Sequence, residues 1–374
     1  MTTNQSPLRL NIAVVGASQS GKTTLISSFY GHQCTNAFES EHGYQLMIRD
    51  STQGDRLLAN YYGMRDNGRF PAASSFFDEY VFDVEVQGKA ADQGLELHWF
   101  DYPGAFWSTN FDGADLDVLK HLKTLLQAHV GFLLIDGKAY LEGGGNYLNS
   151  YFSQFRDYVR RVLSRLEAMG EPVSEFPRIW VLAMTKADLF GPDFTAHKLS
   201  QEIENVAATS LRDLGTVIGS KDGGLGKRVM LLSSVQSEDG RKVTSTSSYG
   251  LDLMAPLALQ AMSDEMFKAL QSLIPANAPF KEQLEKLLPF VLSNFPQAID
   301  AVELAMGPKF PAWLRVLLGN LKPMVLAKVE DIERQHKEAL KQRKMLESTL
   351  LGMKVTLEKS DRLYHQKPEK VAVG

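Results

Sequence analysis

Hydrophobic and polar positions along the first 273 residues alternate between two kinds of segment. Short apolar runs rich in β-branched and aromatic residues are typical of strands, and they occur at 10–15, 80–86, 95–100, 130–136, 178–185 and 228–234. Helical patterns occur at 114–128, 148–169, 196–214 and 253–273. A polar, glycine-containing turn between the second and third runs predicts an antiparallel hairpin. The remaining alternation predicts an α/β fold, with a mainly parallel sheet and helices on both of its faces.

Two segments depart from this alternation. Residues 31–73 form a long connection with a possible strand at Tyr44–Ile48, a helix-like DRLLANYYGM and the breaker sequence DNGRFP. After residue 273, the sequence IPANAPF indicates a domain boundary, and residues 280–374 are helical in pattern with no strand signal. We therefore expect a domain at 8–273, which contains the 31–73 insertion, and an α-helical extension at 280–374.

Apolar positions between Val325 and Met353 are spaced alternately by four and three residues, which suggests a short coiled coil. His336 and Arg343 interrupt that pattern, and a helix packed on the first domain explains the spacing equally well. Partner binding, self-association and an amphipathic membrane contact at Phe310–Leu326 stay open.

Composition narrows the class of protein. Hydrophobic residues make up 44% and charged residues 22%, which is the balance of a globular chain. The net charge of -4 and the pI of about 6.1 give no reason to expect nucleic acid as a partner. Cys34 is the only cysteine, so an intramolecular disulfide and a multi-thiolate zinc site are excluded. With no secretory signal and no apolar run near the length of a membrane span, we expect a cytoplasmic protein without a transmembrane segment.

The strongest motif in the chain is Gly16-Ala-Ser-Gln-Ser-Gly21-Lys22-Thr23, which matches G-x-x-x-x-G-K-[ST] between a predicted strand and a predicted helix. Glycines let backbone N–H groups converge on phosphate oxygens, and the helix N-terminus adds its positive dipole end. Lys22 would reach the β- and γ-phosphates, and Thr23 would ligate Mg²⁺. The candidate phosphate-binding residues are Gly16, Ser18, Ser20, Gly21, Lys22, Thr23 and Thr24.

A P-loop identifies a phosphate but not a base. Thr185-Lys186-Ala187-Asp188 follows the fifth predicted strand and resembles the [NT]KxD element of GTPases. Its carboxylate can accept hydrogen bonds from guanine N1–H and the exocyclic amine, whereas adenine offers no such pair of donors. Ser233 and Ser234 end the sixth predicted strand, where GTPases place a short turn that contacts guanine O6. The plainer interpretations are a helix-capping pair and an ordinary turn.

A fourth element, Asp101-Tyr102-Pro103-Gly104, resembles the DxxG motif, in which the Asp holds Mg²⁺ through water and the Gly N–H contacts the γ-phosphate. With four elements in order, the chain resembles the TRAFAC class of P-loop GTPases over residues 8–273. The resemblance implies GTP or GDP and Mg²⁺ as ligands, with Lys22 and Gly104 acting at the reacting phosphate.

The sequence Gly68-Arg69-Phe70-Pro71-Ala72-Ala73-Ser74 also resembles the bacterial double-GTPase branch, in which a G-x-[FW]-P-x-x-T pattern supplies the switch I threonine. Serine replaces threonine in this chain. The resemblance implies Ser74 as a metal ligand beside Thr23 and Asp101, although Ser75 is one residue away.

Many GTPases place a water-orienting Gln directly after the DxxG glycine, and this chain has Ala105 there. Slow intrinsic turnover is therefore expected, with help from Arg69 in cis or from a partner in trans. We favour a nucleotide-dependent switch that hydrolyses GTP and meets a protein partner through its switch loops or helical C-terminus. A GTP-dependent scaffold with negligible turnover is the alternative, and an ATPase is a more distant one.

Overall fold

The computed structural model describes residues 8–42, 44–73, 77–86, 95–102, 104, 116–173, 179–218, 225–238, 242–255, 257 and 362–365. By its internal contacts the chain divides into two units, residues 1–261 with 353–374, and residues 262–352. The second unit lies outside the described residues, as do most of the 280–374 segment and the coiled-coil pattern at 325–353.

The elements of the described residues follow the predicted alternation. The strands are β1 (Leu8–Gly16), β2 (Tyr44–Ile48), β3 (Asp78–Val86), β4 (Leu95–Asp101), β5 (Val130–Asp136), β6 (Ile179–Thr185), β7 (Arg228–Leu231), β8 (Ser233–Glu238), β9 (Lys242–Tyr249) and β10 (Leu363–His365). The helices are α1 (Lys22–Gln33), α2 (Asn36–His42), α3 (Ser51–Asn67), α4 (Leu116–Leu126), α5 (Gly137–Ala168) and α6 (Ala196–Val217), with 3₁₀ turns η3 (Ala187–Leu189) and η5 (Leu251–Leu253).

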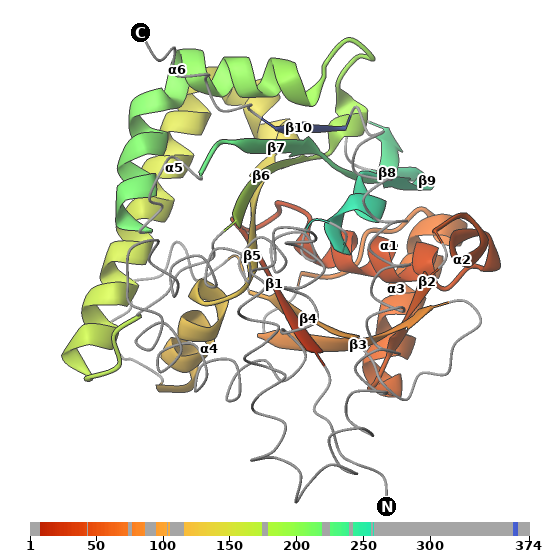
Figure 1. The fold of residues 1–374 in the computed structure, drawn as a ribbon. Coiled ribbons are helices and arrows are strands. Elements are labelled where there is room, and N and C mark those ends of the chain that lie inside the picture. Colours follow the sequence, from red (N-terminus) through yellow and green to blue (C-terminus); the bar gives the residue numbers. More distant parts are fainter. Residues whose placement is uncertain are drawn as a thin grey trace, which may run out of the picture. The chain divides into compact units, whose positions relative to one another are not determined.

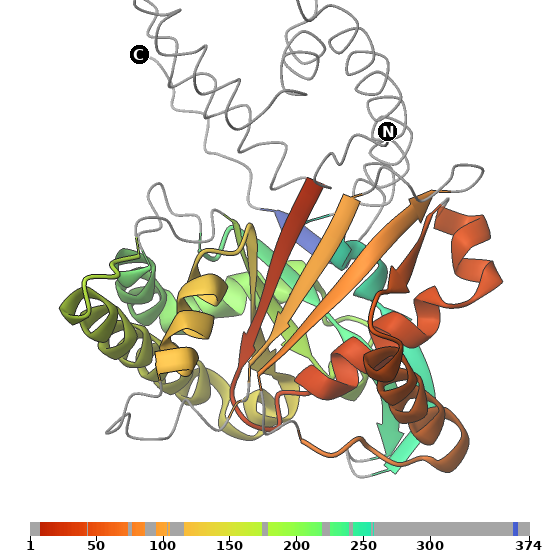
Figure 2. The ribbon, with the colours of Figure 1, turned by 90° about the horizontal axis from the view of Figure 1, so that it is seen from below.

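The main sheet of the described residues has the strand order β10-β7-β6-β5-β1-β4-β3-β2 (Figure 1). Strands β4, β1, β5, β6 and β7 run parallel, while β3 and β2 are antiparallel additions at one edge. Helices α1 and α3 cover one face and α4, α5 and α6 the other (Figure 2). Every residue of β5 and β6 is buried, as expected for central strands covered on both sides. The predicted α/β fold, the 80–86/95–100 hairpin and the strand at Tyr44–Ile48 are confirmed.

Two sequence-based expectations are wrong. The run 228–234 is not one strand, because β7 ends at Leu231 and Ser233 begins β8, which pairs with β9 in a separate two-stranded sheet. Nor is the segment 280–374 helical throughout, because β10 pairs antiparallel with β7 (Figure 1). An edge strand presents unpaired backbone groups, and the Leu231 N–H accordingly donates to the Arg362 carbonyl at 3.2 Å.

The insertion after α1 is an ordered part of the domain. Asp50 caps the N-terminus of α3 by accepting hydrogen bonds from the N–H groups of Thr52 and Gln53. Gly68 ends the same helix with a φ of +63°, a conformation that glycine adopts without strain. Its carbonyl accepts a hydrogen bond from Val243 N–H of β9 at 3.2 Å, so the C-terminal end of α3 is joined to the β8–β9 hairpin.

Candidate nucleotide site

The P-loop follows β1 and ends at the first turn of α1. Gly21 has a φ of +88° and Gln19 a φ of +65°, so the backbone turns through the left-handed region at both positions. Only glycine does so without strain, and Gln19 is therefore a locally strained residue in the loop. Thr23 and Thr24 lie half-buried in the first turn of α1.

Lys22 is buried beneath this loop. Its ammonium donates to the carbonyl oxygens of Gly16 at 2.8 Å and Ala17 at 3.0 Å. Burial lowers the pKa of Lys22 to about 8, against the opposing influence of the Asp101 charge. Both carbonyls belong to the backbone of the loop. The Lys22 ammonium is therefore held next to the loop in which a phosphate would bind.

Asp101 ends β4 beside β1, where its backbone is the register partner of Val14. The carboxylate is buried, and in the described part of the chain neither oxygen has a hydrogen-bond partner of ordinary geometry. Burial raises its pKa to about 7, although the nearby Lys22 charge acts in the opposite direction. A buried carboxylate in this state fits a divalent cation, because the cation would add to the partial charge compensation that Lys22 provides.

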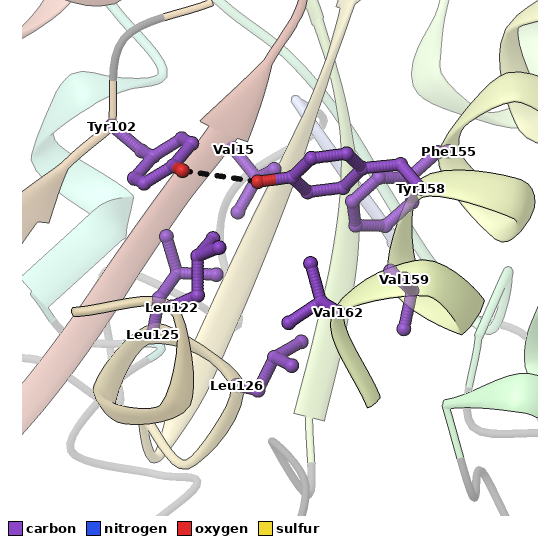
Figure 3. Close-up of a pocket in the computed structure, with 9 residues that line it drawn as sticks. All are labelled: Val15, Tyr102, Leu122, Leu125, Leu126, Phe155, Tyr158, Val159 and Val162. Carbon is purple, nitrogen blue, oxygen red and sulfur yellow. Dashed lines mark hydrogen bonds between the residues drawn. The ribbon is translucent and has the colours of Figure 1, made fainter. Parts of the chain in front are cut away.

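Gly104 lies directly against the P-loop. A Cβ atom at this position would stand 2.4 Å from Ser18 N and 2.5 Å from the Ala17 carbonyl carbon. The segment leading to it is anchored in the core, where the Tyr158 hydroxyl of α5 donates to the Tyr102 hydroxyl at 3.1 Å (Figure 3). Burial raises the pKa of both phenols, so both stay neutral and share this hydrogen bond beside a small apolar cavity lined by Val15, Leu122 and Phe155.

The segment 185–188 joins the P-loop directly. The Thr185 hydroxyl donates to the Ser20 carbonyl at 2.9 Å, and the Lys186 ammonium pairs with Asp136 at 2.7 Å. Lys186 has a φ of +57°, which places a second strained non-glycine residue in the site. Asp136, which also caps α5, was missed by sequence reasoning, although a carboxylate at the end of a buried strand was the available signal.

Asp188 is half-buried in η3, and its carboxylate faces β8. Oδ1 lies 3.1 Å from the Ser233 hydroxyl, and Oδ2 accepts from both the N–H and the hydroxyl of Ser237, each at 3.1 Å. The Ser234 carbonyl accepts from the Ser28 hydroxyl of α1 at 2.9 Å. Ser237 was also missed, because nothing in the local sequence ties it to Asp188.

The structure thus brings four predicted segments together at the carboxyl ends of the parallel strands: the P-loop, Asp101 with Gly104, 185–188 and 233–234. Ser74 and Ser75 lie outside the described residues, and so does Ala105. Arg69 is exposed just beyond the C-terminal cap of α3. Among the described residues, no helix is both long and apolar enough to cross a membrane.

This mainly parallel sheet, with the P-loop at the end of β1, has the fold of the P-loop GTPases. The chain matches the Double-GTPase 2 family over residues 11–221, which is more than half of its 374 residues. It belongs to that family, and the resemblance to the double-GTPase branch is confirmed.

No curated protein sequence matches the chain. Among solved structures it is similar to the S. cerevisiae Ski7 GTPase-like domain bound to GDP and inorganic phosphate, at 16% identity over 61% of this chain and 43% of that chain, with a TM-score of 0.31. It is also similar to elongation factor SelB from Methanococcus maripaludis with the GTP analogue GppNHp, at 11% identity over 70% and 35% of the two chains, with a TM-score of 0.29.

A third similar structure is the signal recognition particle receptor SRb-GTP/SRX complex from Chaetomium thermophilum, at 16% identity over 62% of this chain and 91% of that chain, with a TM-score of 0.33. The chain spans less than half the length of the Ski7 and SelB chains.

Proposed function

We propose that this protein binds GTP and GDP with Mg²⁺ and hydrolyses GTP slowly, as a nucleotide-dependent switch. The observation that carries the proposal is the hydrogen bond from Thr185 to the Ser20 carbonyl, which fixes the segment for the base against the loop for the phosphates. Family membership supports the same ligand. A nucleotide lying across this contact would have its phosphates at Lys22 and its base at Asp188.

Thr23, Asp101 and Ser74 would hold the metal ion. Mg²⁺ prefers oxygen ligands, and it is usually held by one or two protein groups together with substrate phosphates. The orphaned, buried Asp101 fits this role, and Thr23 is in the first helical turn directly after Lys22. When bound, the ion would neutralise charge on the phosphates. Lys22 and the N–H of Gly104 would add charge and a hydrogen bond from the protein side.

Guanine selectivity would come from Asp188. An ionised carboxylate only accepts hydrogen bonds, so it matches the adjacent N1–H and amine donors of guanine and not the edge of adenine. For this reason we keep an ATPase as the more distant alternative.

Turnover would be slow, because Ala105 offers no polar group to orient water. Arg69 is exposed near the segment that leads to Ser74 and is the first candidate for help in cis. A partner that reaches the switch loops or the helical C-terminal part is the other source of such a group. The second candidate function, a GTP-dependent scaffold with negligible turnover, is favoured by the same Ala105.

The test uses the purified full chain and compares affinities for GTP, GDP and ATP in wild type and in Lys22→Ala. We expect a preference for guanine nucleotides, and a loss of about 10- to 100-fold in GTP affinity for Lys22→Ala, because a hydrogen bond to a charged group is removed. Lys198→Ala, which removes an exposed lysine of α6, is the matched control and should bind like wild type. Unchanged GTP affinity in folded Lys22→Ala would refute the assigned site. Rapid hydrolysis by the isolated chain would refute slow turnover and the scaffold alternative alike.

A further inference from the structure

The carboxylate of Asp188 is held from one side by a single residue. Ser237 offers two donors to Oδ2, its backbone N–H and its hydroxyl, each at 3.1 Å. Ser233 lies at 3.1 Å from Oδ1, but its hydroxyl also lies 2.6 Å from the Val235 carbonyl. A hydroxyl has one proton to donate, and the shorter contact takes it. Ser237 is therefore the main anchor of the Asp188 carboxylate.

We infer that Ser237 is a positioning residue that orients Asp188 for recognition of the guanine amine, an inference that rests on the proposed function. The two donors belong to one serine, so they lie at most about 3.7 Å apart and subtend less than roughly 75° at Oδ2. They occupy one side of that oxygen. A carboxylate offers about four acceptor directions, and the two donors of Ser237 use those of Oδ2, so the directions on Oδ1 stay available for guanine.

The backbone of β8 explains why Ser237 can donate in this direction. The β8–β9 register shifts between Gln236 and Ser237, and such irregularities redirect backbone and side-chain groups out of the ladder. The hairpin is itself fixed on the domain. Met64 of α3 packs with Val235 and Val243 in a small buried cluster, and Val243 N–H donates to the Gly68 carbonyl. Ser237 thus acts from a supported element, which is what orienting a carboxylate requires.

The experiment measures affinities of the full chain for GTP and for inosine triphosphate, which lacks the 2-amino group. Their ratio reports the bond between the amine and Asp188, because every other contact is shared. We expect Ser237→Ala to lower the GTP-to-ITP ratio by several-fold, up to about tenfold, because GTP loses the amine contact in addition to any loss at N1–H that ITP shares. Ser237→Thr keeps both donors and should restore the ratio.

Ser245→Ala is the matched control, because the Ser245 hydroxyl donates to Gln236 within the same hairpin at 3.1 Å, whereas the donors near Asp188 in the described residues belong to Ser233 and Ser237. It should leave the ratio unchanged. Equal losses of affinity for GTP and ITP in Ser237→Ala would overturn the inference, because they would indicate that Ser237 only stabilises the hairpin. Tighter GTP binding in Ser237→Ala would also overturn it, because Ser237 would then compete with the base for Asp188. A wild type that binds GTP and ATP equally refutes the proposed function itself. A guanine-selective wild type whose ratio ignores Ser237→Ala refutes only this inference.

Discussion

Replacing Gly104 with Ala should separate nucleotide binding from hydrolysis. The added Cβ would stand 2.4 Å from Ser18 N and 2.6 Å from Ser18 Cα, whereas ordinary contacts of a carbon atom lie at about 3.5–4.0 Å. The two segments must therefore separate by about 1 Å, and no change of rotamer can help, because the opposing atoms are backbone. Tyr102 is anchored to Tyr158, so the displacement falls on Gly104 itself.

A misplacement of about 1 Å at reacting groups costs on the order of 100-fold in rate, which corresponds to about 2.7 kcal/mol in the barrier. We expect Gly104→Ala to bind GDP like wild type and to hydrolyse GTP about 100-fold more slowly in single-turnover measurements. Gly131→Ala is the control, because its Cβ would meet the Trp180 ring at 2.7 Å inside the sheet, away from the P-loop. A hydrolysis rate in Gly104→Ala equal to that of wild type would refute the reasoning. An equally large loss of rate in Gly131→Ala would also refute it, because a loss of stability would then explain both variants.

Three further predictions concern the base, the metal and the C-terminal strand. Asp188→Asn should weaken GTP and strengthen XTP binding, each by about 10- to 100-fold, because an amide donates where xanthine has a carbonyl; competition among GTP, XTP and ATP measures this, and an unmoved ratio refutes it. Ser74→Ala should weaken Mg²⁺-dependent retention of GTP more than that of GDP, with Ser75→Ala as control; equal effects on both nucleotides move the ligand elsewhere. Arg362→Ala breaks a 2.8 Å ion pair with the largely buried Asp252 and should lower the free energy of unfolding by about 1–3 kcal/mol. Denaturant titration measures this loss, and Arg362→Lys, which keeps the charge, is the control. An unfolding free energy equal to that of wild type in Arg362→Ala refutes the prediction.

The strands of the main sheet could be predicted because burial on both faces produces continuous apolar runs, as in β5 and β6. The start of α5 could not. α5 is interrupted at Gly144, whose φ of +52° and ψ of -137° are not helical, so a short helical segment from Gly137 precedes the long one. The helical pattern begins at residue 148, just after this break, and the glycines at 143–145 hide the short segment before it. The end of β7 was predicted too late, because the apolar run continues through Leu232, one residue beyond the end of the strand at Leu231. The Asp239-Gly240 dipeptide between alternating segments was the available signal for the β8–β9 hairpin.

The residues of the candidate site also fall into those that the sequence predicts and those that it does not. Residues proposed to contact the phosphates from one loop, such as Gly21 and Lys22, have fixed spacing, so a motif predicts them. Residues that orient those groups come from elsewhere in the chain: Asp136 is 50 positions from Lys186, and Ser237 is 49 positions from Asp188. Their identity depends on which strand ends meet at the edge of the sheet, and one sequence does not specify such distances.

The β8–β9 hairpin gives this division a functional consequence. It contacts the Asp188 carboxylate through Ser237, helix α1 through Ser234, and the end of α3 through Val243. The end of α3 leads directly to the segment that carries Ser74, the proposed switch I ligand. Asp188 and the C-terminal end of α3 are therefore both hydrogen-bonded to one two-stranded sheet. This connection between the segment of Asp188 and the end of α3 is one that the linear order of the motifs does not indicate.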